Sequence, residues 1–323
     1  MTNDQNFADR LYEAIDKTQN PSVIGLDPRL ESIPGFIKQE NIDKHGKTFK
    51  AAASSFFDFN KEIMKELKGI VPAVKPQLAF YEEYGSVGIK AFKDTIDEAK
   101  RLGFIIIADG KRNDIGSTSK AYANAFLGKT DLFGTETPCF DVDSLTVNAY
   151  LGSDGILPFV ESCKDFGKGI FALVKTSNPS SSEFQDLTLG DNKMYEIVAS
   201  LVNDWGFECI GNRGYSSIGA VVGATHPKQA ANIRKIIPRS FFLVPGFGAQ
   251  GGTADDTIPC FNKDGFGAIV NSSRGVIFAY KNKNNNNRQD KSEESFAKIA
   301  AQAAIDMKQQ LHSSLKKADI DPW

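Results

Sequence analysis

The chain has 323 residues, of which 41% are hydrophobic and 24% are charged. This composition is that of a globular protein with a large core, and the length fits either one large domain or two smaller ones. The formal net charge of −2 at pH 7 provides no basic surface, which argues against nucleic acid and anionic membranes as partners.

The amino-terminal segment mixes charges and lacks the apolar core of a signal peptide, and no later stretch approaches the length of a membrane span. We therefore expect a cytoplasmic protein. The four cysteines lie far apart without C-x-x-C spacing, and the three histidines are isolated from one another. This arrangement indicates neither a metal site, nor a disulfide framework, nor a Ser-His pair, so we expect the chemistry to rest on other residues.

The first elements of the chain alternate between helices and a short apolar strand. Residues 4–18 predict an amphipathic helix, and residues 22–27 (SVIGLD) predict a strand that ends at Asp27. A second helix is expected over 48–67, where apolar residues recur at helical spacing, and Gly69 follows it.

The second predicted strand covers residues 70–75 (IVPAVK) and ends at Lys75, because Pro76 cannot donate to a sheet ladder. A lysine at a strand end often turns its amine outward to water. Lys75, however, is the last residue of its predicted strand, as Asp27 is of the first one, so we expect both at the same end of the sheet. The next helix is expected over 86–102.

The stretch 104–118 (FIIIADGKRNDIGST) passes from apolar to charged within a few residues. Its first four residues run without a polar break, as in a parallel strand that is buried on both faces. Asp109 and Lys111 are two residues apart, so an extended backbone projects both from the same face, and Asp114 follows. Charges packed this closely are costly to bury unless they neutralise one another.

Ordinary surface ion pairs are the simplest explanation of an isolated D-x-K-x-x-D pattern. The rest of the chain favours a catalytic explanation, because it repeats the alternation of strands and helices. Five further strands are predicted at 144–150, 169–176, 218–225, 241–246 and 266–271. Helices are expected between most of them, at 153–166, 191–204 and 227–236.

Counted from SVIGLD, eight strands alternate with helices, which predicts a (β/α)8 TIM barrel, an α/β fold, as a single domain over residues 1–323. Active sites of this fold lie at the C-terminal ends of the strands. Asp27, Lys75 and Asp109 are all expected at that end, so we interpret the charged stretch as part of an active site.

Four segments depart from a minimal barrel. Three connections are longer than the fold needs and are predicted to be lids or insertions. They cover 28–47, 119–143 and 177–217. The fourth segment, 281–294, is polar and rich in asparagine, so we expect a disordered excursion there, followed by a final helix over 295–316.

Two segments near the end of the chain indicate a phosphate site. PGFGAQGG at 245–252 contains G-x-G-x-x-G, but no amphipathic helix opens at its third glycine, so a dinucleotide site is not expected. We interpret it as a loop after strand seven, whose Gln250 and backbone N–H groups contact a phosphate. NSSRG at 271–275 follows strand eight and offers the permanently charged guanidinium of Arg274. Phosphate-binding barrels place their site in these two loops.

Six separated motifs together resemble the orotidine 5′-monophosphate decarboxylase family, in particular its larger branch. They span residues 21–280 and occur in the order found in that family. The motifs are GLDP at 25–28, Lys75, D-x-K-x-x-D-I with Thr118 at 109–118, TSNP at 176–179, PGFGAQGG at 245–252 and SSRG at 272–275. One departure is Ser273, where some members have glycine before the arginine.

The resemblance implies a homodimeric enzyme that converts orotidine 5′-monophosphate (OMP) to UMP and CO2 in de novo pyrimidine biosynthesis, without a metal or a cofactor. It also implies a catalytic tetrad of alternating charges, formed by Lys75, Asp109, Lys111 and Asp114. In the family, the residues that match Asp114, Ile115 and Thr118 enter the active site of the neighbouring subunit.

The resemblance further implies which residues bind the substrate. Asp27 would bind the ribose, Ser177 the edge of the pyrimidine and Pro245 its apolar face. Ser177 would also meet the phosphate loop over the closed site. The phosphate would be bound by Gln250, Arg274 and the neighbouring Ser273.

The chemistry of the reaction independently favours a fixed cation. Loss of CO2 from C6 of a pyrimidine leaves a carbanion with no adjacent carbonyl to delocalise it, and the sequence shows no site for a metal or a covalent cofactor. Lys111, held between carboxylates that favour its charged form, can stabilise this carbanion and then protonate it.

Two other functions fit parts of the pattern. A Mg²⁺-dependent sugar-phosphate decarboxylase of the same barrel group also carries D-x-K-x-x-D, but its second strand offers a glutamate as metal ligand where this chain has Lys75. A phosphate-binding barrel without catalysis is the other alternative, which the presence of all four charged residues disfavours. The sequence leaves open whether the chain is natively fused to an orotate phosphoribosyltransferase.

Overall fold

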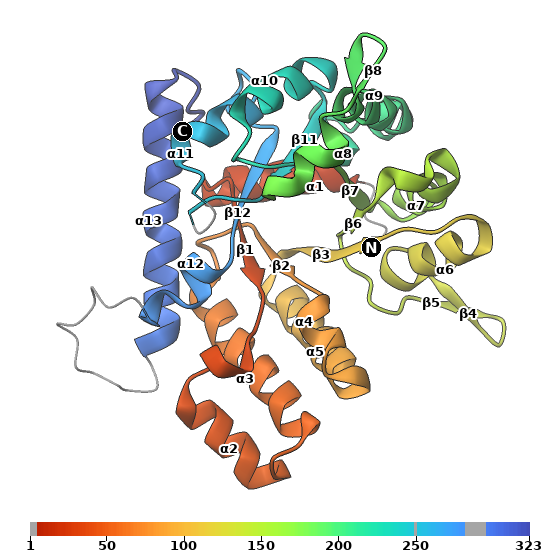
Figure 1. The fold of residues 1–323 in the computed structure, drawn as a ribbon. Coiled ribbons are helices and arrows are strands. Elements are labelled where there is room, and N and C mark those ends of the chain that lie inside the picture. The colour runs from red at the N-terminus through yellow and green to blue at the C-terminus, as the bar shows by residue number, and fades with distance from the viewer. Residues whose placement is uncertain (1–4, 249–250, 282–294) are drawn as a thin grey trace.

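The computed structural model describes residues 5–248, 251–281 and 295–323. Among them, eight parallel strands form a closed barrel in the order β1-β12-β11-β10-β7-β6-β3-β2, and β1 pairs with both β12 and β2 (Figure 1). The strands are β1 (Ser22–Leu26), β2 (Ala73–Pro76), β3 (Ile105–Arg112), β6 (Ser144–Val147), β7 (Gly169–Lys175), β10 (Ser216–Val222), β11 (Ser240–Val244) and β12 (Ala268–Ser272). The (β/α)8 barrel predicted from the sequence is confirmed.

The barrel strands carry unbroken apolar runs because both of their faces are buried. Every residue of β1, β10 and β11 is buried. One face of each strand points into the barrel and the other packs against the surrounding helices. The strands therefore leave polar chemistry to their C-terminal ends.

Apart from three helices of the long connections, which are described below, the described residues form seven longer α-helices and three short ones. The longer helices are α1 (Phe7–Thr18), α3 (Phe49–Leu67), α5 (Gly85–Leu102), α7 (Ser153–Phe166), α9 (Met194–Gly206), α10 (Pro227–Ile236) and α13 (Ser295–Lys317). The short helices within this part of the chain are α4 (Ala79–Glu82), α11 (Ala254–Thr257) and α12 (Arg274–Ile277). No helix in the described ranges is long and apolar enough to span a bilayer.

Helix α3 illustrates how the outer layer is held. Its residues Phe56, Phe59 and Ile63 are fully buried and lie on one face at helical spacing. The ring of Phe59 stacks on Phe296 of α13, with 5.4 Å between the ring centroids. Helix α13 thus runs along one flank of the barrel, beside α11 and α12 (Figure 1).

The long connections contain secondary structure that the sequence pattern does not predict. Helix α2 (Gly35–His45) lies in 28–47, and only Ile37 and Asn41 of this helix are buried, so its periodicity is weak. The range 119–143 contains most of α6 (Gly116–Phe126) and a hairpin of β4 (Thr130–Leu132) and β5 (Thr135–Thr137). The range 177–217 adds α8 (Ser182–Gln185) and a hairpin of β8 (Thr188–Leu189) and β9 (Asn192–Lys193). The expected disordered excursion at 281–294 lies, except for its first residue, outside the described residues.

Helix α1 closes the N-terminal end of the barrel. The ring of Phe7 meets Phe171 of β7 edge-on, with 5.9 Å between their centroids. The carboxylate of Asp9 accepts the backbone N–H groups of Asn212 and Arg213, just before β10, at 2.8 and 2.7 Å. These contacts close the N-terminal end of the barrel. The charged residues predicted to form the active site lie at the other end, where the strands terminate.

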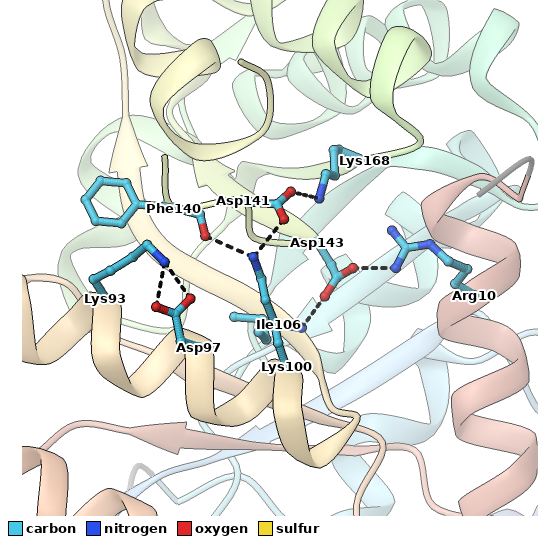
Figure 2. A network of polar contacts seen from close by, with 9 residues as sticks. All are labelled: Arg10, Lys93, Asp97, Lys100, Ile106, Phe140, Asp141, Asp143 and Lys168. Carbon is cyan, nitrogen blue, oxygen red and sulfur yellow. Dashed lines mark hydrogen bonds and ion pairs between the residues drawn. The ribbon is translucent and has the colours of Figure 1, made fainter. Parts of the chain in front are cut away.

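A network of ion pairs fastens the helices to this closed end, as Figure 2 shows. Arg10 of α1 donates to Asp143, and the other carboxylate oxygen of Asp143 accepts the backbone N–H of Ile106 at 2.9 Å. Next to it, Asp141 accepts from Lys100 of α5 at 2.8 Å. The network thus connects α1 and α5 to the segment before β6, at the N-terminal ends of the strands.

Candidate active site

The C-terminal ends of the eight strands surround a cavity of about 590 Å³. Each of the eight strands, or the loop that follows it, contributes at least one lining residue. A hollow of similar volume lies beside α2 and is lined by residues such as Leu30, Lys38 and Ile42, away from the strand ends. Only the cavity at the strand ends gathers the charged residues that the sequence singled out, so it is the candidate active site.

Asp109 is the centre of the polar contacts in this cavity. Its Oδ2 atom accepts from Lys75 Nζ at 2.7 Å and from Gln77 Nε2 at 2.9 Å. Its Oδ1 atom accepts from Lys111 Nζ at 2.6 Å and from Thr146 Oγ1 at 2.9 Å. Four donors therefore fix one carboxylate, and two of them are cations: Lys75 from the neighbouring strand β2 and Lys111 from β3 itself.

The charges of this cluster stabilise one another. Burial alone would raise the pKa of Asp109, but Lys75 and Lys111 outweigh it and hold the pKa well below its usual range. Burial alone would lower the pKa of Lys75, but the carboxylates of Asp109 and Asp27 raise it above its usual value. Asp109 and Lys75 are thus both held in their charged forms and are already in place before a substrate arrives.

Asp27 lies in a different electrostatic setting. Burial raises its pKa above the usual value, although Lys75 partly opposes this shift. Gly25 precedes it by two residues, and a Cβ atom at Gly25 would lie 1.8 Å from Ser273 Oγ. The glycine of the GLDP motif therefore makes room for the loop after β12 to approach Asp27.

Lys111 reaches the cluster through a backbone conformation that alternation along a strand does not predict. Its φ angle is +47°, in the left-handed region, and the pairing of β3 with β6 shifts register between Ala108 and Arg112. The backbone N–H of Lys111 donates to Thr146 Oγ1 at 3.0 Å. Left-handed conformations of non-glycine residues cost about 1–3 kcal/mol and are concentrated at functional sites. Its ammonium approaches Asp109 from the open side of the cavity, where 45% of the Lys111 side chain is exposed.

Asp114 does not join the other three charged residues within one chain. Its Oδ1 atom accepts the N–H of the adjacent Ile115 at 2.8 Å, and it is absent from the cavity lining. Ile115 is 53% exposed and Thr118 is exposed as well. The structure of the single chain thus brings together three members of the predicted tetrad and leaves Asp114 outside the cavity lining.

Of the predicted substrate-binding residues, Ile115 and Thr118 are absent from the cavity lining, and five others line it. These five come from the ends of four strands and are Asp27, Ser177, Pro245, Ser273 and Arg274. Gln250 lies outside the described residues. Gly246, Gly248 and Gly251 all have positive φ angles, and the helix that follows them, α11, begins only at Ala254 and has four residues. This geometry agrees with the rejection of a dinucleotide motif.

Several cavity residues were missed in the sequence. Gln77 lies two residues after Lys75, and Thr146 is an inward-facing residue of β6. Side chains on one face of a strand recur every two residues, and this spacing could have identified both. Asn271 begins the NSSRG motif, and its buried Oδ1 atom has no hydrogen-bond partner among the described residues. Arg29 also lines the cavity, with its guanidinium over the ring of Phe80 at 5.2 Å.

Comparison with known proteins assigns the family. The sequence model of the orotidine 5′-phosphate decarboxylase / HUMPS family matches residues 24–288. The chain belongs to this family. It is 46% identical to the orotidine 5′-phosphate decarboxylase of Caldicellulosiruptor saccharolyticus over 86% of this chain and 91% of that protein. It is 43% identical to the enzyme of the same name from Rhodopirellula baltica over 94% of this chain and 98% of the other.

The solved structures agree with this assignment. The Leishmania donovani OMP decarboxylase superposes with a TM-score of 0.69 and 27% identity, covering 96% of this chain and 98% of that one. The resemblance inferred from the motifs is therefore confirmed.

Proposed function

We propose that this protein decarboxylates orotidine 5′-monophosphate to UMP and CO2 in de novo pyrimidine biosynthesis, without a metal or a cofactor. The observation that carries the proposal is the position of Asp109 between the ammonium groups of Lys75 and Lys111, at 2.7 and 2.6 Å, in a cavity formed by all eight strand ends. The relatives that share most of the chain carry the name of this enzyme.

Lys111 is the residue that meets the reacting carbon. When the bond from C6 to the carboxylate breaks, the electron pair stays on C6 and CO2 leaves. The ammonium of Lys111 stabilises this charge as it develops and then transfers one proton from Nζ to C6. Asp109 holds the ammonium in place and is itself fixed by Lys75, so little reorganisation is left for the reaction itself.

The remaining cavity residues bind the parts of the substrate that do not react. Asp27 binds the ribose hydroxyls, Ser177 the edge of the pyrimidine and Pro245 its face. Arg274 binds the phosphate together with the loop that contains Ser273. The loop after β11, which includes Gln250, also binds the phosphate. Contacts to a remote phosphate favour the closed, reactive arrangement of an active site.

A second copy of the chain supplies the fourth charge in this proposal. Asp114 of the partner subunit approaches Lys111, and Ile115 and Thr118 accompany it. Exposed apolar side chains in the segments that follow the paired strands β3 and β6 support an interface, because monomers rarely expose large apolar patches. Besides Ile115, they are Leu132, Phe133, Tyr150 and Leu151, which are 51%, 106%, 71% and 44% exposed.

The Mg²⁺-dependent alternative conflicts with Lys75. That branch needs a carboxylate at the end of β2, whereas here a buried ammonium occupies this position and contacts Asp109 at 2.7 Å. A divalent cation beside this ammonium would be repelled. Burying two oppositely charged groups costs desolvation free energy, and a barrel without catalysis would gain no activity in return.

The decisive assay follows the absorbance change of OMP in buffer with EDTA and no added metal. We expect turnover by the wild-type chain and a large increase in KM for the Arg274→Ala variant, since this variant lacks the bidentate contact to the phosphate. An enzyme that turns over only with added Mg²⁺, or not at all, would refute the proposal. The cytoplasmic location stays a prediction.

A further inference from the structure

Lys175 carries a fully buried charge that the proposed reaction does not use. It is the last residue of β7, its side chain has 0% exposure, and it does not line the cavity. Its Nζ atom lies 3.0 Å from Asp186 Oδ1 and 3.2 Å from Ser181 Oγ. A buried ammonium requires such partners. Both partners belong to the loop that follows β7, so the charge connects this loop to the barrel.

The same loop is closed at its ends. The N–H of Thr176 donates to Gln185 Oε1 at 2.9 Å, and Gln185 Nε2 donates back to Thr176 Oγ1 at 2.8 Å. Thr225 Oγ1, after β10, donates to the carbonyl of Ser177 at 3.1 Å. The segment 176–186 therefore leaves the barrel at Lys175 and returns to the same ammonium at Asp186.

The end of β10 forms the floor of this loop. A Cβ atom at Gly223 would lie 2.8–2.9 Å from three atoms of Ser177, so the backbone of Ser177 rests directly on this glycine. His226 lies beside the cluster, with Nε2 at 3.4 Å from Ser181 Oγ. Burial and the charge of Lys175 lower the pKa of His226, which disfavours a second positive charge beside the ammonium.

We infer that Lys175, Ser181 and Asp186 form a latch that positions the loop 176–186 over the cavity. Ser177 and Gln185 of this loop line the cavity, whereas the latch residues lie behind it. The inference rests on the proposed function, in which Ser177 contacts the pyrimidine edge. The latch residues are positioning residues: they act on the base of the nucleotide through Ser177 and have no contact with the phosphate site at β12.

The double variant Lys175→Met/Asp186→Asn tests the latch, because it removes both charges with little change in side-chain volume. We expect a folded protein whose kcat/KM for OMP falls at least about tenfold, since small displacements of a positioning group have effects of this size. UMP should bind more weakly. Ribose 5-phosphate, which lacks the base, should bind within about twofold of the wild type, because its affinity depends on phosphate and ribose contacts alone.

The matched control is Lys168→Met/Asp141→Asn, which makes the same chemical change to an ion pair of 2.7 Å at the closed end of the barrel. Its kinetics should equal those of the wild type. The latch is refuted if the folded double variant keeps wild-type kcat/KM, or if UMP and ribose 5-phosphate lose affinity equally.

Ser181→Ala decides the question if the double variant does not fold, because it keeps the ion pair. It should lower kcat/KM at least about threefold, because it removes the hydrogen bond that Ser181 Oγ accepts from the Lys175 ammonium, and unchanged kinetics would refute the latch. If the wild type shows no OMP turnover, the proposed function fails instead. The comparison of UMP with ribose 5-phosphate still tests the latch in that case.

Discussion

Asp27 and Asp109 are two carboxylates in one cavity whose pKa values move in opposite directions. Asp109 has two lysines as direct partners, at 2.6 and 2.7 Å, and they hold its pKa well below the usual range. For Asp27, burial outweighs the attraction of Lys75 and raises the pKa. The sequence predicts the presence of both acids at strand ends, but it cannot rank these opposing effects because they depend on distances between separate strands.

Asp27→Asn should therefore stabilise the free protein at pH 7 while it weakens binding of the ribose. Because its folded pKa lies above the unfolded one, Asp27 contributes favourably only below the unfolded pKa of about 4, and this contribution is lost as the pH rises through the folded value. The gain in the free energy of unfolding should be present at pH 7 and should vanish toward pH 4. Urea unfolding at several pH values measures it.

The matched control is Asp109→Asn, for which the sign is reversed. Asp109 has a lowered pKa, so its contribution is complete above the unfolded pKa of about 4 and declines only at lower pH. This variant should be destabilised at pH 7, because Lys75 stays buried without its carboxylate. Equal shifts of the same sign in both variants would contradict the electrostatic description of the cavity.

At the scale of single elements, β3 and α6 show where a sequence pattern succeeds and where it fails. The apolar start of β3 was predicted, and its charged end lies at the cavity as expected. The side chains of Asp109 and Lys111 do meet, but through a left-handed residue and a register shift, not through simple alternation. Helix α6 was missed because GSTSKAYANAF has weak helix propensity, and its position depends on contacts such as Ser119 Oγ to the carbonyl of Gly155 at 2.9 Å.

Helix α1 offers a test of the closed end of the barrel. Arg10→Leu removes the partner of Asp143, which is 15% exposed (Figure 2). Hydrogen bonds to charged groups contribute about 1.5–3 kcal/mol, so the free energy of unfolding should fall by about 2 kcal/mol. Turnover per folded molecule should not change, because α1 lies at the opposite end from the cavity. Calorimetry and the decarboxylation assay measure the two effects.

Lys93→Met is the matched control, since it removes an exposed ion pair of α5 with Asp97 that is visible in the same figure (Figure 2). Its free energy of unfolding should change by no more than about 0.5 kcal/mol, as is usual for surface pairs. A loss of turnover in Arg10→Leu would contradict the independence of α1 from the cavity. Equal effects of both variants on the free energy of unfolding would contradict a stabilising role of the Arg10–Asp143 pair.

At the scale of the whole molecule, the period of strands and helices was enough to predict the barrel. The barrel in turn predicted the site, because it brings the ends of all eight strands together whatever their distance in sequence. Gln77 and Thr146 escaped notice because nothing distinguishes them from other polar residues until Asp109 is seen between them. A single domain over the whole chain remains a prediction, as does the second subunit that would supply Asp114 to the cavity.

The turnover of Lys111→Ala, alone and after subunit exchange with Asp114→Ala, tests the central claim most directly. Each variant alone should lose at least about 10³-fold in kcat while it still binds UMP, because the charges act mainly in the transition state. In an equal mixture, half of the dimers carry one site with both native residues, so about a quarter of all sites should be active. Near-normal turnover by Lys111→Ala would contradict the role of its ammonium, and a mixture as inactive as its parents would contradict a site shared between subunits.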